Sequence, residues 1–521
     1  MPTSTVKHVS WPTSIRKTKR ERPVVLHLIL QSHGKKFRRL VVCLRVFCAL
    51  MILAAGSSAN AQTLKVRIDI TSLVPARIRI QTELPSPTNV LSFRNAYAGV
   101  LGLGERIELV EAISASGQSV RVRKLAPGEF QSDEKFSQFS YEVNVAEPSR
   151  PAQLSHVSWL NRDHGLLMLA DLLPQLTSGS DKVPLALISV DVPKGWTVAS
   201  NIKKEGSQFS TDDLETAGFL VGPAVHEKRQ RLASIDFSII LSGKFPFSDG
   251  DAIEIAEKIV EEYSRVTRFE LKSNAVVMLI PYPGEAGPES WSAETRGNGV
   301  VLVLGRKASH KKVLARLGIV LSHELFHLWV PNSLKLAGDY DWFFEGFTLY
   351  QALRTDFRLG LISFEDYLDT LARVYDSYLA SADGDRLSLI EASERRWTSS
   401  SSVVYEKGML VAFLYDLTLR SLKNCEASLD DVYADLFRAS ATGQGNANET
   451  IIKVLNERLG LNSFAKDYIE SAGKISLDAT LSTYGIQLQR GTPGVSPMKL
   501  VVSRELNTTQ RRLLGCIGYR R

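Results

Sequence analysis

The sequence predicts an α+β chain of several domains, in which a β-rich N-terminal part precedes a mixed part and a helical C-terminal part. Its 521 residues exceed the ~100–200 residues of one ordinary domain. Its content of 44% hydrophobic and 23% charged residues is typical of globular proteins. Apolar residues alternate with polar residues in the first half, whereas in the second half they recur at helical spacing.

The first 61 residues have the pattern of a secretory signal peptide. Basic residues precede an apolar run from Val46 to Ala55, and the small-residue sequence Ala59-Asn60-Ala61 follows. Such a segment is cleaved after the small residues, here before Gln62. We therefore expect residues 1–61 to be a signal peptide, and the protein to be exported to the periplasm or the extracellular space.

A membrane anchor is the alternative reading of this segment. The wider apolar stretch from Leu40 to Ala55 has only 16 residues and contains Arg45. A membrane-spanning helix needs ~20 apolar residues. No stable membrane span is therefore expected after signal cleavage.

The positive charge of the chain comes from this leader. The net charge is +7, but residues 1–61 hold 11 of the 63 Lys and Arg residues and a single acidic residue, Glu21. The remaining chain has 52 basic and 55 acidic residues, a net charge of −3. The charge balance thus indicates no nucleic-acid partner for the folded body.

Cys425 and Cys516 are the two cysteines that remain after signal cleavage. An oxidising compartment would permit a disulfide between them. The sequence alone does not place them close in space, so a disulfide and two separate thiols both stay open.

Residues 62–247 are expected to form a β-rich N-terminal domain. Val66, Ile68 and Ile70 alternate with charged residues, and Phe139 to Val145 repeat this period of two. Pro and Gly residues separate the runs, as turns between strands do. An antiparallel β sandwich or layered sheet is predicted.

The pattern changes after Ser248. Two short apolar runs, Val276 to Ile280 and Val300 to Leu304, are typical of buried strands, and helical spacing dominates from Lys311 almost to Leu488. We expect a second domain, of strands and helices, over residues 248–394, a helical domain over 395–488 and a C-terminal tail over 489–521.

A pattern that carries chemistry lies in the helical stretch, at His323-Glu324-Leu325-Phe326-His327. Histidines four residues apart lie on one helix face, so both can reach a single metal ion, with Glu324 beside them as a base. Two partly buried histidines that bond to backbone carbonyls are the structural alternative. Catalytic zinc needs a third protein ligand, and Glu345, within Trp342 to Tyr350, is a candidate 18 residues after His327.

Three segments resemble the gluzincin zinc metallopeptidases, and most closely the glycyl aminopeptidase family: His323 to Trp329, Trp342 to Tyr350 and Arg358 to Leu368. The resemblance implies a thermolysin-like catalytic domain with one Zn²⁺ ion per chain, and a peptide or protein substrate. It also implies a site in which His323, His327 and Glu345 bind zinc, Glu324 is the general base that activates the zinc-bound water, and Tyr405 steadies the oxyanion.

The same resemblance suggests how substrate binds. Glu294 would hold the free α-ammonium group of a peptide, and the backbone at Gly297 and Gly299 would let substrate pair along a strand edge. Removal of N-terminal residues is therefore expected. An endopeptidase or other amide hydrolase on the same site, and an inactive peptide-binding envelope protein, remain as alternatives.

The sequence also departs from the family pattern. Leu349 stands where an acidic residue would orient a ligand histidine, so the partners of the ligands are not identified. Only 33 residues follow Leu488, too few for the C-terminal PDZ domain that such proteins often carry. Arg395-Arg396 is interpreted as a solvated pair or a lid-loop element rather than a substrate clamp.

Overall fold

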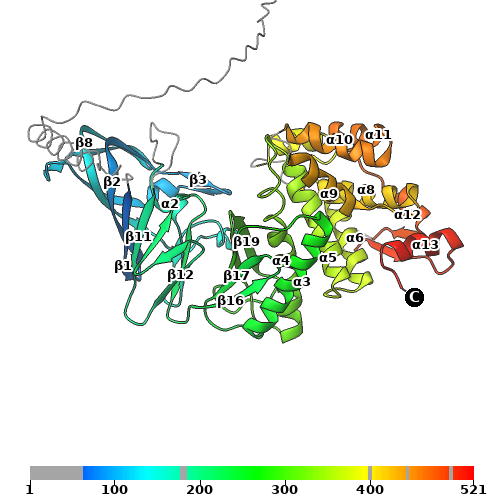
Figure 1. The fold of residues 1–521 in the computed structure, drawn as a ribbon, viewed down its shortest axis with the longest axis horizontal. Coiled ribbons are helices and arrows are strands. Elements are labelled where there is room, and N and C mark those ends of the chain that lie inside the picture. The colour runs from blue at the N-terminus through cyan, green and yellow to red at the C-terminus, as the bar shows by residue number, and fades with distance from the viewer. Residues whose placement is uncertain (1–62, 176–184, 397–401, 442–444, 492–496, 521) are drawn as a thin grey trace, which may run out of the picture. The chain divides into compact units, whose positions relative to one another are not determined.

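The computed structural model describes residues 63–175, 185–396, 402–441, 445–491 and 497–520 (Figure 1). The predicted signal peptide lies outside the described residues. From Gln62 onward the chain forms one compact unit. A β-rich region is followed by a helical region, which confirms the α+β fold class.

The N-terminal region is built on a nine-stranded sheet, in the order β13-β14-β11-β1-β2-β8-β5-β6, with β7 also paired to β8. On β1, Leu64, Val66 and Ile68 point into the core and the residues between them face outward, as the alternation predicts. Most pairings are antiparallel, but β1 pairs with β11 in parallel. The strands of this sheet are β1 (Leu64–Leu73), β2 (Ala76–Ser92), β5 (Ile107–Ile113), β6 (Ser119–Val120), β7 (Val122–Ala126), β8 (Glu129–Asn144), β11 (Ala186–Asp191), β13 (Lys203–Glu205) and β14 (Gln208–Thr211).

A smaller four-stranded sheet of order β12-β15-β10-β9 and a short β3-β4 hairpin complete this region. Their elements, with the short helical turns, are β3 (Ala96–Tyr97), β4 (Val100–Leu101), η1 (Leu103–Arg106), η2 (Pro151–Gln153), β9 (Trp159–Leu160), β10 (Gly165–Met168), α2 (Leu169–Leu172), β12 (Thr197–Ser200) and β15 (Gly218–Gly222).

The catalytic region contains a five-stranded sheet in the order β16-β17-β18-β20-β19. Its strands are β16 (His226–Leu232), β17 (Ile235–Leu241), β18 (Ala275–Pro281), β19 (Trp291–Arg296) and β20 (Gly299–Leu304). All residues of β18 and β20 are buried, because one face packs on helices α3 (Asp249–Thr267) and α4 (His310–Phe326) and the other on β9 and β10. β19 lies at one edge of the sheet and pairs with β20 in antiparallel.

This sheet begins earlier in the chain than the sequence pattern indicated. β16 and β17 lie before residue 247, yet β17 pairs in parallel with β18. The connection runs through α3, whose start is closed by a capping box between Ser248 and Asp251. A parallel pair needs such a crossover helix, so β16 and β17 belong to the catalytic sheet.

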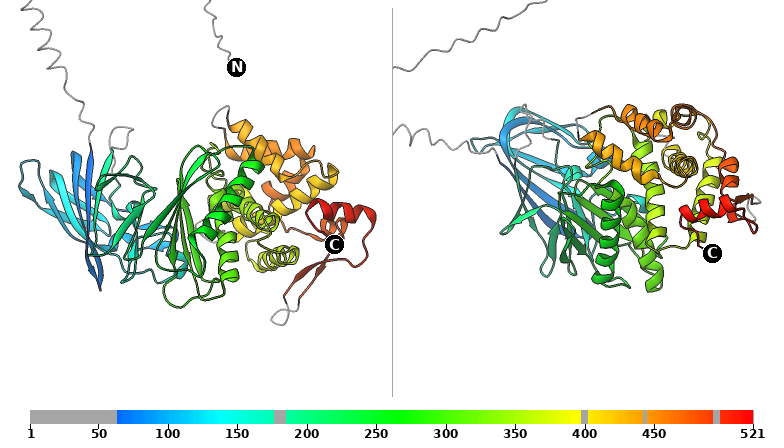
Figure 2. Two further views of the ribbon diagram at one scale, coloured as in Figure 1. Left: turned by 60° about the horizontal axis from the view of Figure 1, so that its bottom comes forward. Right: turned by 45° about the vertical axis from the view of Figure 1, so that its right-hand side comes forward.

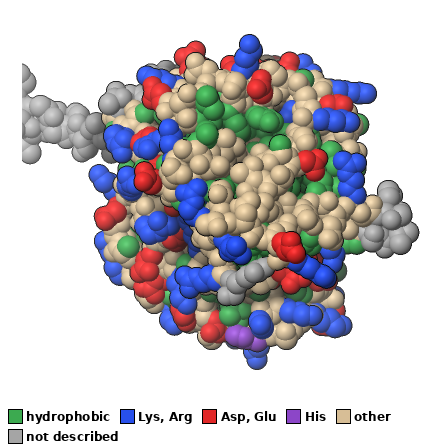
Figure 3. Space-filling model, turned by 90° about the vertical axis from the view of Figure 1, so that its right-hand side faces the viewer, with side chains coloured by type: hydrophobic (Ala, Val, Ile, Leu, Met, Phe, Trp, Pro, Cys, Tyr) green, Lys and Arg blue, Asp and Glu red, His purple; other side chains and the backbone are tan. Residues whose placement is uncertain are grey.

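The helical region surrounds α8, most of whose residues are buried (Figure 2). Its elements are η3 (Trp342–Phe347), α5 (Thr348–Arg358), α6 (Phe364–Ala380), α7 (Leu389–Glu394), η4 (Val403–Lys407), α8 (Gly408–Leu422), α9 (Leu429–Ser440), α10 (Ala447–Leu459), α11 (Ser463–Ala465), η5 (Lys466–Glu470) and α12 (Asp478–Thr483). On the face shown in Figure 3, Lys and Arg side chains are interspersed with Asp and Glu, and hydrophobic side chains gather in the upper part.

The C-terminal segment, expected as a tail, is folded. It contains β22 (Lys499–Val502), which pairs with β21 (Ile486–Gln489), and helix α13 (Thr508–Cys516). Leu500, Leu513 and Leu514 are buried in the main core, which explains why this segment is held against the helices.

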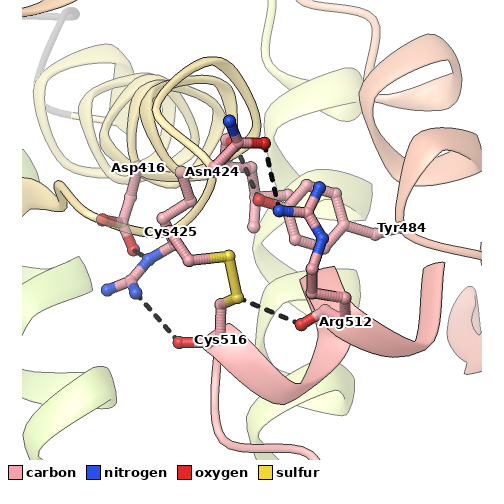
Figure 4. The surroundings of a disulfide bond; sticks show 8 residues. Asp416, Asn424, Cys425, Tyr484, Arg512 and Cys516 are labelled. Carbon is pink, nitrogen blue, oxygen red and sulfur yellow. Dashed lines mark hydrogen bonds and ion pairs between the residues drawn. A yellow bond between two sulfur atoms is a disulfide. The ribbon is translucent and has the colours of Figure 1, made fainter. Parts of the chain in front are cut away.

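A disulfide joins Cys425, just after α8, to Cys516 at the end of α13 (Figure 4). Their Cα atoms are 5.9 Å apart, and 91 residues separate them in sequence. Arg420 Nη1 donates a hydrogen bond of 2.9 Å to the carbonyl oxygen of Cys516, and Arg512 Nη1 donates to Asn424 Oδ1 at 3.0 Å. Of the two alternatives that the sequence left open, the structure has the disulfide.

Two glycines set the distance between η3-α5 and η4-α8. A Cβ added to Gly346 would lie 2.6 Å from Cα of Gly408 and 2.7 Å from the carbonyl oxygen of Val404. A Cβ on Gly408 would lie 2.8 Å from the carbonyl oxygen of Trp342. The two backbones therefore touch directly beside Glu345 and Tyr405.

Removal of the disulfide should lower the stability of the chain. Closing a loop of this length stabilises a fold by about 4–5 kcal/mol in the chain-entropy account. We expect the Cys425→Ser, Cys516→Ser variant to unfold at clearly lower denaturant concentration than the oxidised protein, as followed by circular dichroism. Addition of dithiothreitol should shift the wild type toward the variant and leave the variant unchanged; an unshifted wild type would contradict the prediction.

Gly346→Ala should separate the two helices. Because the added methyl group meets backbone atoms, we expect a loss of about 1–3 kcal/mol in unfolding free energy, measured by denaturant unfolding. Gly515→Ala is the matched control, since there an added Cβ meets no described atom within 4 Å. Equal stability of the two variants would show that the contact is not tight.

Candidate zinc site

The two histidines of the HExxH pattern come together on α4 and the turn that ends it. The Nε2 atoms of His323 and His327 are 3.2 Å apart. His327 is buried, His323 is half-buried, and Glu324 between them is 5% exposed. The helix thus presents both imidazole nitrogens to one point, as residues four apart should.

Glu345 joins them from η3, a π-helical turn that leads into α5. Its Oε2 atom lies 3.5 Å from His323 Nε2 and 3.6 Å from His327 Nε2. The neighbouring aromatic residues Trp342, Phe343 and Phe347 are fully buried and pack on one another. This packing fixes the turn that carries Glu345, and π-helical turns are common at functional sites.

The three ligand atoms fit a zinc ion. A tetrahedral zinc with ligands at about 2.0–2.1 Å has its ligand atoms about 3.3–3.4 Å apart. The three separations here are 3.2, 3.5 and 3.6 Å. His323, His327 and Glu345 are also the cluster in the described chain whose atoms lie close enough together to hold a metal.

The electrostatics of the site favour a cation. Burial alone would lower the pKa of His327, but the carboxylates of Glu345 and Glu324 outweigh it and raise this pKa to about 9. Positive charge is therefore stabilised where the ligand atoms meet. The same carboxylates would stabilise a divalent ion.

Backbone rather than an acidic residue orients one of the ligands. Nδ1 of His327 donates a hydrogen bond of 3.0 Å to the carbonyl oxygen of Val330. This bond leaves Nε2 free to bind metal, which is the usual arrangement in zinc sites. Nδ1 of His323 is buried and has no partner among the described residues.

Glu324 is held by Thr295 of β19, a residue that sequence reasoning missed. The Thr295 hydroxyl lies 2.7 Å from Glu324 Oε2 and 2.8 Å from the Glu324 carbonyl oxygen. The edge strand thus anchors one carboxylate oxygen of the predicted base. The alternation along β19 could have indicated that Thr295 and Glu294 point to opposite faces. The contact of Thr295 with α4, however, depends on the position of β19 in the sheet, which the sequence does not give.

Arg396 links the ligand Glu345 to Tyr405, and it too was missed. Its Nη2 atom donates to Glu345 Oε1 at 2.7 Å and to the Tyr405 hydroxyl at 2.7 Å. Its Nη1 atom donates to Asp341 Oδ1 at 2.5 Å. Its side chain is mostly buried, so the solvated-pair interpretation of Arg395-Arg396 was wrong for this residue.

Tyr405 retains its proton in this environment. Burial, together with the negative charge of Glu345, raises the pKa of Tyr405 well above its usual value. The hydroxyl accepts a hydrogen bond from Arg396, so its own proton stays available for donation. It can therefore stabilise negative charge that develops beside the ligand cluster.

The side chain of Glu294 points to the N-terminal region and away from Glu324. Tyr97 donates to its Oε1 atom at 2.5 Å and His156 Nδ1 donates to Oε2 at 2.8 Å. Arg296 contacts both oxygens, at 3.0 and 3.1 Å. Burial would raise the pKa of Glu294, but the hydrogen bond from His156 and the charge of Arg296 hold it below its usual value.

Glu294 accepts three hydrogen bonds, from Tyr97, His156 and Arg296 Nη2, and a carboxylate accepts about four. The protein itself therefore occupies most of the places where an α-ammonium group would bind Glu294. Because adjacent strand residues point to opposite faces, Thr295 reaches Glu324 while Glu294 turns away. These contacts do not favour the predicted role of Glu294 in substrate binding.

Gly297 lies in the turn between β19 and β20, and Gly299 is the first residue of β20. Gly297 has a φ of +55°. A Cβ on it would lie 3.0 Å from the Thr216 side chain, and one on Gly299 would lie 2.7 Å from Asn201 Nδ2. Close packing against the N-terminal region thus explains both glycines without a substrate.

Comparison with known proteins agrees with this geometry. Residues 316–411 match the family model described as M61 glycyl aminopeptidase. The chain is similar in fold to an aminopeptidase N family protein from Idiomarina loihiensis, with 21% identity, a TM-score of 0.70 and coverage of 82% of this chain and 79% of that one. An M1 zinc metallopeptidase from Deinococcus radiodurans gives 14% identity and a TM-score of 0.47, over 80% of this chain and 95% of that one. No curated protein sequence matches the chain.

The matched segment contains the three ligand residues, Glu324, Arg396 and Tyr405. The match over residues 316–411 and the ligand triad support a zinc metallopeptidase, and this segment is similar to the M61 glycyl aminopeptidases.

Proposed function

We propose that the chain is an exported enzyme that hydrolyses peptide bonds and removes N-terminal residues from peptides. The observation that carries the proposal is the convergence of three zinc-ligand atoms with the Glu324 carboxylate and, through Arg396, the Tyr405 hydroxyl. A zinc peptidase needs a base, an oxyanion donor and a Lewis acid within one site, and this arrangement supplies residues for all three.

The chemistry that a bound zinc ion supplies is Lewis-acid polarisation of water and of a carbonyl group. His323, His327 and Glu345 would hold the ion. Glu324 takes the proton of the attacking water and then delivers it to the leaving amine. The hydrogen bond from Thr295 to Oε2 fixes the orientation of this carboxylate during both transfers.

Tyr405 donates its hydrogen bond to the oxygen of the scissile carbonyl as negative charge develops there. Such a donor is effective because it is oriented before the reaction begins. Arg396 provides the orientation through its bond to the phenolic oxygen. The raised pKa of Tyr405 keeps the proton on the donor.

Export is supported by two features. The leader over residues 1–61 has the pattern of a signal peptide. The Cys425–Cys516 disulfide is typical of proteins from oxidising compartments. Among the described residues, no helix has the length and apolar character of a membrane span.

An endopeptidase on the same site is the second candidate. It is favoured by one observation, the three hydrogen bonds that Glu294 accepts from Tyr97, His156 and Arg296. Aminopeptidase activity is supported by the family match over residues 316–411. The two candidates differ in whether a free N-terminus is required.

Replacement of Glu324 tests the mechanism. We expect Glu324→Gln to retain about one zinc per chain, measured by elemental analysis, and to lose about 10²–10⁴-fold in kcat, because an amide cannot accept the proton of water. Glu261→Gln, on the exposed face of α3, is the matched control with wild-type activity. Full activity of Glu324→Gln would rule out this mechanism.

Paired peptides test the exopeptidase proposal. We expect cleavage of a peptide with a free N-terminus and no cleavage of its N-acetylated form, followed by chromatography of the products. A chelator should abolish the activity and added zinc should restore it. Cleavage of both peptides at similar rates would establish the endopeptidase instead.

Glu294→Gln shows in the same assay what the Glu294 carboxylate does. From its protein contacts we expect a lower melting temperature with KM for the free peptide unchanged. A large increase in KM at unchanged stability would instead show that this carboxylate holds the α-ammonium group.

A further inference from the structure

Arg396 donates hydrogen bonds both to Glu345, a zinc-ligand residue, and to Tyr405, the proposed oxyanion donor. Both hydrogen bonds leave from one nitrogen, Nη2, which has two hydrogens. One hydrogen is directed at Glu345 Oε1 and the other at the Tyr405 hydroxyl. The angle between these bonds is set by the planar guanidinium group.

The bond to Glu345 divides the roles of its two oxygens. Oε1 accepts from Arg396 at 2.7 Å, while Oε2 is the atom that lies 3.5 and 3.6 Å from the histidine nitrogens. A carboxylate can bind a metal through one oxygen or through two. Catalytic zinc sites keep a position open for water beside three protein ligands, and a second oxygen from Glu345 would compete for that position.

Arg396 is itself fixed on its other sides. Asp341 accepts from Nη1 at 2.5 Å. The guanidinium carbon lies 5.7 Å from the ring centre of Phe344 and 5.5 Å from that of Tyr405, within range of a cation–π interaction. With its side chain only 14% exposed, this cation has few alternative positions.

We propose that Arg396 is a positioning residue that holds Glu345 to a single metal-binding oxygen and, through the same nitrogen, sets the orientation of the Tyr405 hydroxyl. It acts through these two residues and touches neither the ligand histidines nor the base in the contacts described. The effect on Glu345 is independent of the substrate, whereas the effect on Tyr405 rests on the proposed function.

The test compares Arg396→Met, which retains length without a donor, with Arg396→Lys, which retains charge without the fork. Arg386→Met, an exposed arginine between α6 and α7, is the matched control. Each variant is loaded with Co²⁺ alone and its visible spectrum recorded. Zinc affinity is measured against a chromophoric chelator, and kcat and KM on a peptide with a free N-terminus.

For Arg396→Met we expect a weaker, shifted cobalt band, because freed Oε1 joins the metal, and a change in zinc affinity of about 10–100-fold. We expect kcat to fall by about 10–100-fold with KM changed by less than about threefold. Arg396→Lys should partly restore both the cobalt spectrum and kcat. In a Tyr405→Phe background the loss of kcat should be smaller, since one of the two routes is already removed.

A folded Arg396→Met protein with the wild-type cobalt spectrum and wild-type kcat would overturn the proposal. If circular dichroism shows that Arg396→Met does not fold, Arg396→Lys is tested in the same assays. A wild-type cobalt spectrum and a wild-type kcat for Arg396→Lys would then overturn the proposal. If the wild type binds zinc but cleaves no peptide, the proposed function fails, while the cobalt spectra still decide the role at Glu345.

Discussion

The structure of the site depends on one buried anion, the carboxylate of Glu345. Its residue is 6% exposed, and a buried charge without compensation is costly. Two histidine rings and the Arg396 guanidinium surround it, so each oxygen faces a group that carries or attracts positive charge. Burial would raise the pKa of Glu345, but these neighbours hold it well below its usual value. The carboxylate therefore stays ionised, which a metal ligand must be.

The backbone keeps this anion in register with its partners. Glu345 and Tyr405 lie on separate helical segments, and each segment has a glycine where the two meet, Gly346 and Gly408. Side-chain packing alone leaves room for small adjustments, whereas contact between two backbones does not. The aromatic layer beneath η3 adds a second constraint, because its rings are buried and in mutual contact.

Local spacing made part of this site predictable. His323 and His327 lie one helical turn apart, so their spacing predicts that they share a helix face. Glu345 was predicted from the pattern of residues around it, Trp342 to Tyr350. Arg396 is 51 residues from Glu345, and no spacing rule connects them. The disulfide spans 91 residues, and the sequence could name it only as one of two alternatives. β17 begins with the same alternation as the strands before it, and only its parallel pairing with β18 assigns it, with its neighbour β16, to the catalytic sheet.

The edge strand β19 has two faces with different neighbours. Ser292, Glu294 and Arg296 bond to residues of the N-terminal region, while Thr295 reaches the catalytic helix. The β-rich region therefore supports the strand that positions Glu324, the proposed general base. Such a shared strand couples the evolution of the two regions. A substitution at His156 or Tyr97 alters the contacts of Glu294, and the next residue in the strand is Thr295, which bonds to Glu324. The catalytic region is thus not an independent module that could be exchanged between proteins without its β partner.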